Sequence, residues 1–237
     1  MFKIKQIVFV FFALLISVPA FSQGGLEVGA FLMPQSVWIF NKDDSDQGPN
    51  LDYVPTYTFA YGAEVGLNLG RTVGLQTGLI ISKQGQDYDS DGSGSFGFGV
   101  PNNWIGTERS VELTYLKIPL LFKFNSNPDA GTAFLFKIGP QFTFLTNAES
   151  TVNGGVDNST SNLALKDLYE KNHIGAVMSI GARFTMAENL FLNTSFRFDA
   201  SLGDVEDKDQ DAYWPSERPD GRAVTGGFQI GLSYNIN

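Results

Sequence analysis

The stretch from Thr114 to Leu145 alternates between apolar and mixed side chains with a period of two, and one short polar break interrupts it. This is the period of a β-strand, whose successive side chains point to opposite faces. One face is apolar throughout, at Leu116, Ile118, Leu120, Phe122, Phe124, Phe134, Phe136, Ile138, Pro140, Phe142 and Phe144. The other face mixes lysine, glycine and glutamine. This combination is typical of a sheet with lipid outside and a small polar lumen inside.

Six further segments alternate in the same way, so the chain predicts eight strands. Their approximate ranges are 25–33, 56–69, 73–84, 111–124, 132–145, 173–186, 190–202 and 226–237. In the fourth segment the apolar residues change parity near Tyr115, which a β-bulge or a strand top standing clear of lipid would explain. We therefore expect an all-β fold, an eight-stranded antiparallel transmembrane β-barrel.

The connections between these segments alternate in length. The connections at 70–72, 125–131 and 187–189 are short, whereas those at about 41–55, 85–110, 146–172 and 203–225 are long. Outer-membrane barrels have short periplasmic turns and longer extracellular loops. The long loops also hold most of the formal net charge of -9, which argues against nucleic acid as a partner.

Residues 1–22 have the features of a cleaved secretory signal peptide. Lys3 and Lys5 precede an apolar run, and small residues stand before the expected cleavage site after Ser22. The run is shorter than the roughly 20 residues that a transmembrane helix needs. The barrel domain would then occupy residues 23–237, and the absence of cysteine excludes disulfides and thiolate metal sites.

The run YLKIPLLFKF, followed about a dozen residues later by FKIGPQFTFL, resembles the PorT-like outer-membrane β-barrel family of Gram-negative bacteria. The resemblance implies a location in the outer membrane. Some members of that family are linked to protein secretion across this membrane, so the resemblance also implies such a role without matching particular residues to it.

Eight charged residues share the lumen-facing parity of their strands: Glu27, Glu64, Lys117, Lys123, Lys137, Arg183, Arg197 and Asp199. The interior of an eight-stranded barrel is just wide enough for side chains to fill, so buried charges there must pair. We expect Glu64 to pair with Lys117 and Lys137 near mid-depth, with Glu27, Lys123 and Arg183 closer to the periplasm. A structural plug is favoured over the alternative, a gated conduit.

The sequence contains no convincing catalytic constellation. His173 is the only histidine, and no Ser-His-acid spacing can be argued around it. The best ligand motif is Asp87, Asp89 and Asp91 followed by Gly92, which matches the first half of a calcium loop but lacks its closing glutamate. A solvated acidic loop is the favoured interpretation, with calcium as the alternative, and no other cofactor is expected.

These features predict a non-enzymatic protein of the outer membrane, exported through its signal peptide. It would act through acidic extracellular loops, as a surface component or one associated with envelope assembly or secretion. Its expected partners are outer-membrane lipid and other envelope or secretion proteins. The alternatives are a lipid-modifying enzyme of the outer membrane and a narrow gated channel.

Overall fold

The computed structural model describes residues 25–40, 52–89, 109–126, 131–152, 155–156, 162–207 and 221–236. The predicted signal peptide therefore lies outside the described residues. The elements are β1 (Leu26–Phe40), β2 (Asp52–Val54), β3 (Thr56–Asn68), β4 (Val73–Asp89), β5 (Arg109–Asn125), β6 (Thr132–Val152), β7 (Gly155–Val156), α3 (Asn162–Asp167), β8 (Asn172–Ala187), β9 (Leu190–Ser201) and β10 (Arg222–Ile236). No helix within these ranges is long and apolar enough to cross a membrane.

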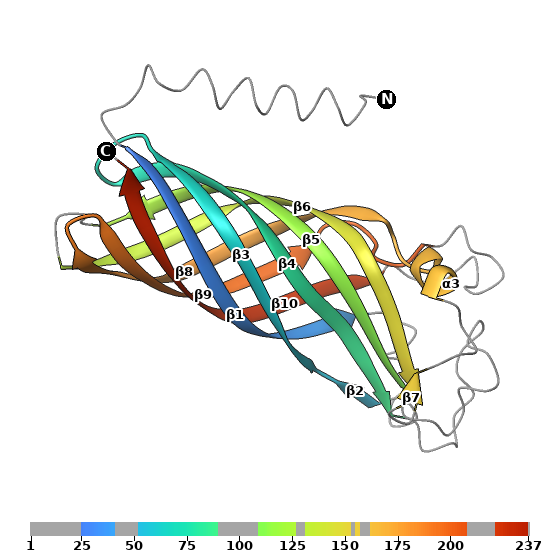
Figure 1. Cartoon of the computed structure of the whole chain (residues 1–237). Coiled ribbons are helices and arrows are strands. Elements are labelled where there is room, and N and C mark those ends of the chain that lie inside the picture. Colours follow the sequence, from blue (N-terminus) through green and yellow to red (C-terminus); the bar gives the residue numbers. More distant parts are fainter. Residues whose placement is uncertain are drawn as a thin grey trace, which may run out of the picture.

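Eight long strands form a single sheet that closes on itself (Figure 1). The ring runs β1, β3, β4, β5, β6, β8, β9, β10 and back to β1, and every neighbouring pair is antiparallel. Closure leaves no free edge along the wall, so the backbone groups of each strand have partners on both sides. The predicted eight-stranded antiparallel barrel is confirmed.

The two ends of the barrel differ, as the alternating connection lengths predict. The start of β1, the end of β10 and the short turns lie at one end, here called the turn end (Figure 1). The short strands β2 and β7 and the helix α3 lie at the opposite end, here called the loop end. Predicted loop residues in two of the four long connections are thus partly structured, as β2 in one and as β7 and α3 in the other.

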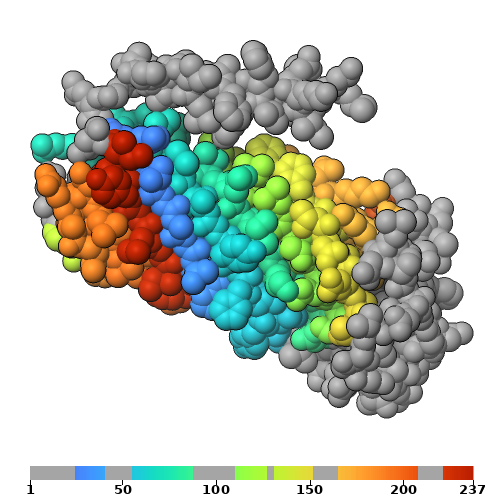
Figure 2. Space-filling model, viewed as in Figure 1, coloured from blue at the N-terminus to red at the C-terminus, as the bar shows by residue number. Residues whose placement is uncertain are grey.

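An apolar band covers the outside of the wall. Outward positions that alternate with the lumen residues are exposed, among them Leu79, Phe196 and Leu232. Figure 2 shows one side of this wall as a continuous surface from β10 across β1 to β3 and β4. Exposed apolar side chains on every strand would be unfavourable in water, whereas they are expected where a barrel meets lipid.

Towards the loop end, β4, β5 and β6 are longer than the sequence predicts. β4 continues to Asp89 and β6 to Val152, so parts of the predicted loops 85–110 and 146–172 are strand. On this extension the outward face is polar, and Lys83 Nζ lies 2.7 Å from Glu112 Oε1. The hydrogen bond that Lys83 donates to the Glu112 carboxylate raises the pKa of Lys83 above its usual value. The extension was missed because its outward side chains no longer have the apolar pattern of a lipid face.

The apparent phase change in β5 is a change of environment. Val111, Leu113 and Tyr115 point inward like Lys117, and only the outward face switches from apolar to polar at Thr114. The second explanation considered, a strand top clear of lipid, is therefore right for β5. A bulge also lies here, but its extra residue belongs to β6, since Thr114 pairs with Asn147 and Tyr115 with Leu145.

β1 also exceeds its predicted range, because it continues past Met33 to Phe40. Pro34 has no N–H to donate, and the pairing with β10 skips Met33 and Pro34 before it resumes at Gln35. The predicted end at Met33 is therefore wrong. Val37 and Ile39 keep the inward parity of Phe31 and are buried. β10 likewise begins at Arg222, inside the predicted loop 203–225.

Candidate functional site

The lumen is filled by side chains from all eight wall strands. The eight charged residues singled out in the sequence all point inward, and seven of them are buried, with only Glu64 partly exposed. Their positions follow from strand periodicity, because each shares the parity of buried neighbours on its own strand. How they pair depends on which heights on different strands meet across the lumen.

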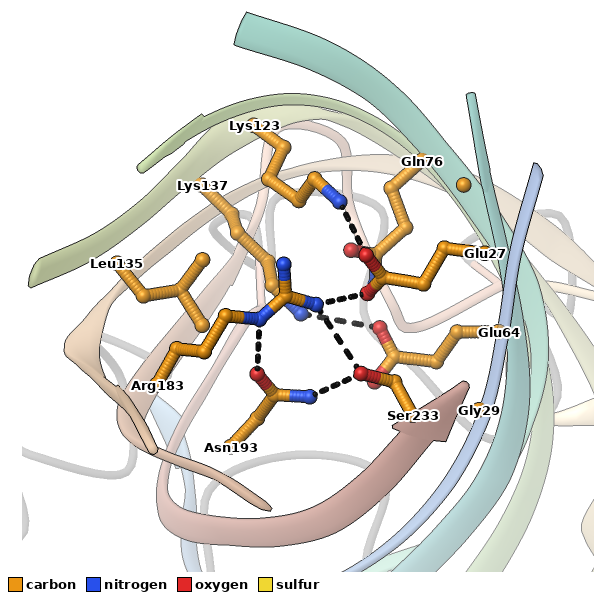
Figure 3. A pocket seen from close by; sticks show the side chains of 11 residues that line it. Glu27, Gly29, Glu64, Gln76, Lys123, Leu135, Lys137, Arg183, Asn193 and Ser233 are labelled. Atoms are coloured by element: carbon orange, nitrogen blue, oxygen red, sulfur yellow. Dashed lines mark hydrogen bonds and ion pairs between the residues drawn. The ribbon is translucent and has the colours of Figure 1, made fainter. Parts of the chain in front are cut away.

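Near the turn end, the Glu27 carboxylate of β1 binds two cations. Lys123 Nζ lies 2.9 Å from Glu27 Oε2, and Arg183 Nη2 lies 2.5 Å from Glu27 Oε1 (Figure 3). Arg183 also donates to Asn193 and Ser233, which fixes the plane of its guanidinium. Burial of all three charged groups makes this cluster depend on complete pairing.

A second link lies beside the first. Lys137 Nζ lies 3.0 Å from Glu64 Oε2, and Gln229 Nε2 donates to Glu64 Oε1 over 2.7 Å. The expected pairing of Glu64 with Lys137 is present, but the expected pairing with Lys117 is not. Lys117 lies too far towards the loop end, because the tilt of the strands offsets heights that sequence counting treats as equal.

Lys117 belongs instead to a separate cluster around Asp199 of β9. Lys117 Nζ lies 2.8 Å from Asp199 Oδ2, and Arg197 Nε lies 2.9 Å from Asp199 Oδ1. Arg197 Nη2 donates to Gln141 Oε1 over 2.6 Å. One carboxylate thus serves two buried cations here, as Glu27 does near the turn end.

The loop end of the lumen is closed by an apolar cap. Leu165, Leu168 and Tyr169 from the β6–β8 connection are buried against inward side chains of the wall. The remaining members of this core are Ile39, Val111, Leu113, Tyr115, Leu145, Ala148, Val205 and Ala223. The backbone of the connection after β9 is hydrogen-bonded to the cap: Asp207 N donates to Leu168 O, and Glu170 N donates to Val205 O.

The cap was missed in the sequence, although a signal exists. Leu165 and Leu168 are three residues apart, the spacing that places two side chains on one face of a helix, inside a loop that was interpreted as polar. Between the cap and the charges lies a polar layer that was also missed. In it Gln84 Nε2 donates to Thr225 Oγ1 over 2.7 Å, and Gln35 Nε2 donates to Ser82 Oγ over 3.1 Å.

Little space remains between the lumen side chains. The charged cluster near the turn end encloses a cavity of about 10 Å³, lined by Glu27, Glu64, Lys123, Lys137 and Arg183 together with Gln76 and neighbouring small residues. This is about the space that one water molecule needs. The arrangement braces the wall, and the charged side chains fill the lumen around this small cavity.

His173 lies at the start of β8 with its ring at 5.5 Å from the ring of Tyr115, edge to face. Its strand neighbour across the sheet is Thr143. Its Nδ1 is buried and has no hydrogen-bond partner among the described residues, so this part of the structure does not pair the imidazole with a nucleophile.

The calcium half-motif is only partly described. Asp87 and Asp89 continue β4, where Asp87 accepts a hydrogen bond from Ser110 and Asp89 pairs in register with Asp52. Asp91 and Gly92 lie outside the described residues. No group of three metal-binding side chains occurs within the described ranges. Calcium binding at this loop remains a prediction.

Comparison with known proteins identifies the class of barrel. A family model described as an outer membrane protein beta-barrel domain matches residues 22–207. No curated protein matches the sequence significantly.

Several solved structures are similar to this chain. The outer membrane protein OprG of Pseudomonas aeruginosa matches with a TM-score of 0.50 at 10% identity, over 90% of this chain and 96% of that one. Neisserial surface protein A matches with a TM-score of 0.44 at 11% identity, over 90% and 97%. The outer membrane protease OmpT of Escherichia coli matches with a TM-score of 0.44 at 7% identity, over 91% and 98%. Identities this low bear on the fold alone.

Proposed function

Because this chain belongs to the outer membrane protein beta-barrel domain family, we propose that it is a closed, non-enzymatic barrel that acts through its loop end. The chain is a protein of the Gram-negative outer membrane. Its proposed role is that of a surface component, or one associated with envelope assembly or secretion. The working surface would be the long connections beyond the wall, and its partners other envelope proteins.

The filled lumen is the observation that supports this proposal. Ion pairs close the turn end and the apolar cap closes the loop end, so the interior has no room for a substrate path. A protein that neither conducts nor catalyses must act through its surfaces. The lipid-facing band is occupied by membrane, which leaves the connections at the loop end.

The extended strands β4, β5 and β6 support the same conclusion. They continue beyond the apolar band with a polar outward face, which includes Lys83, Glu112 and Glu149. The loop-end termini of β4 and β6 therefore lie beyond the apolar band. A binding surface held on a rigid support loses less entropy on association than one on a free loop.

The experiment that tests the proposal is photo-crosslinking in intact cells. A photoreactive residue at Trp104, in the long connection 90–108, is compared with one at Phe196 on the apolar band and one at Asn127 in a short turn. We expect a discrete protein adduct from Trp104 alone. Replacement of residues 91–107 by a short Gly-Ser linker should abolish the cellular function while the barrel still folds.

The alternatives make different demands. A channel or a lipid-modifying enzyme would keep its activity after the replacement of residues 91–107 and lose it after substitution of lumen residues. Adducts at all three positions, or none at Trp104 with function retained in the linker variant, would contradict the proposal.

A further inference from the structure

The charges of the described lumen do not balance. Between the turn end and the cap it holds five basic side chains but only three carboxylates. Glu64 meets Lys137 alone, whereas Glu27 is shared by Lys123 and Arg183, and Asp199 by Lys117 and Arg197. A buried charge without its own counter-charge is costly, so each shared carboxylate leaves one cation to be compensated.

The imbalance coincides with a cavity near the turn end. Lys123, Lys137 and Arg183 all reach its lining from β5, β6 and β8 (Figure 3). Glu27 and Glu64 supply two negative charges from the opposite wall, so the lining carries one more positive charge than negative.

The lysine ammonium groups at this cavity also have fewer hydrogen-bond acceptors than N–H donors. An ammonium group has three N–H donors. Among the described residues, Lys123 Nζ meets one acceptor, Glu27, and Lys137 Nζ meets one, Glu64. Both lysines are buried, so their remaining N–H groups lack acceptors beside a space of about 10 Å³. The cavity therefore has unmet lysine N–H donors and an excess of one positive charge together.

We propose that this cavity binds one small monovalent anion, with chloride as the natural occupant. A water molecule would supply acceptor lone pairs but no charge, whereas a halide supplies both. The space is about that of one water molecule, so it admits at most a single-atom anion, with small shifts of the lysine side chains, and excludes phosphate or sulfate. Glu27 and Glu64 would repel a multivalent anion in any case. The bound anion completes the coordination of Lys123 and Lys137 and acts as a structural counter-ion between the two walls.

The first test is direct observation of a halide. The purified, folded protein is crystallised from sodium bromide, and anomalous scattering is recorded at the bromine edge. The expected result is one peak in the lumen, between the side chains of Lys123 and Lys137. A cavity that contains only water in bromide overturns the proposal.

The second test uses the linkage between binding and stability. Unfolding is followed in 100 mM sodium chloride and in 100 mM sodium gluconate at equal ionic strength. For a dissociation constant of about 10 mM, chloride should raise the folding equilibrium constant about tenfold, since gluconate is too large for the cavity. Equal stability in the two salts contradicts anion binding at this strength.

A carboxylate introduced into the cavity by substitution distinguishes anion binding at this site from a general effect of salt on stability. Gln76 is buried and lines the cavity, so Gln76→Glu supplies the missing charge and should abolish the difference between chloride and gluconate. Gln141→Glu is the matched control, because Gln141 is buried in the lumen but belongs to the Asp199 cluster and not to this cavity. A chloride effect that persists in Gln76→Glu, or disappears equally in Gln141→Glu, overturns the assignment.

Discussion

Lys137 of β6 meets Glu64 of β3 across the lumen, with Nζ 3.0 Å from Oε2, although their strands stand three places apart in the ring. The same separation holds for Lys123 with Glu27, Arg183 with Glu27 and Lys117 with Asp199. In a ring of eight strands, two strands that are three places apart lie on nearly opposite sides of the barrel. Each link therefore holds opposite walls at a fixed distance, a task that backbone ladders between neighbours cannot perform.

Removing the Glu27 carboxylate should damage the barrel more than removing that of Glu64. Glu27→Gln leaves both Lys123 and Arg183 without their carboxylate, and breaking a buried pair typically costs about 3 to 5 kcal/mol. Glu64→Gln affects only Lys137, and Glu64 is partly exposed, so its loss should be smaller. Urea unfolding in lipid vesicles measures the loss in free energy of unfolding for each variant.

The exposed pair on the extension provides the control for these variants. Glu112→Gln removes the partner of Lys83, whose side chain is half exposed, and should cost less than about 1 kcal/mol. A cost for Glu112→Gln equal to that of Glu27→Gln would mean that the lumen pairs have no special weight.

Thr77 is a polar exception on the outward face of β4, and its hydroxyl should matter. It donates to Pro119 O over 2.8 Å, where the pairing of β4 with β5 skips two positions. Water cannot replace this bond on a lipid-facing wall. Thr77→Val should therefore lower the free energy of unfolding by about 1 kcal/mol. Thr194→Val is the control, since Thr194 has no side-chain hydrogen bond to the described residues. Equal effects would remove the role given to Thr77.

The apolar band can be tested by placing a cation on it. Phe196 is exposed on the outward face of β9, and Phe196→Arg should cost about 2 to 4 kcal/mol if the site lies near the bilayer midplane. Thr151→Arg places the same side chain on the outward face of β6 beyond the band, where we expect almost no cost. Folding yields and urea midpoints in vesicles give the comparison. A tolerated arginine at Phe196 would be incompatible with a lipid-facing position.

Because its lumen is filled, the protein should conduct no steady ionic current in a planar bilayer. Ion pairs below and the cap above should prevent a steady ionic current through the purified wild-type protein. Correct folding of the same sample is checked by its resistance to unfolding in urea. A stable conductance whose ion selectivity changes in Glu64→Gln, without loss of folding, would make the lumen a conduit.

The cap should respond to substitution independently of the wall. Leu165 is buried in the cap core, so Leu165→Ala should loosen the β6–β8 connection and speed its cleavage by protease added to intact cells. The barrel should remain folded. Lys171→Ala breaks only an exposed pair with Asp167 and should leave the cleavage rate unchanged. Unchanged cleavage in Leu165→Ala would show that the cap does not hold this connection.

The period-two pattern was sufficient to predict the wall and its two faces. Phe134 and Phe136 point outward while Lys137 points inward, as the alternation requires, because parity along one strand is a local property. The pairing of Lys117 with Asp199 could not be predicted from the sequence. It depends on strand tilt and stagger around the ring, which local patterns do not encode.

The loop end was predicted less well for a different reason. Val111 and Leu113 face a protein core there, while polar residues of the same strand face outward. In the membrane-spanning part of β5 the apolar residues face outward instead, so the direction of the apolar side chains reverses within one strand. Leu165 and Leu168 complete that core from a connection that reads as polar. Only the contact between the two segments reveals the cap.

The long-range ion pairs also constrain the order of events during assembly. Arg183 of β8 and Glu27 of β1 lie on either side of the seam between β10 and β1, so this ion pair forms only when the first and last strands have met and the ring is complete. A partly inserted sheet would expose these charges to the bilayer without their partners. Such intermediates are therefore penalised, and insertion should proceed as a concerted step in which the hairpins cross the membrane together and the first and last strands join late.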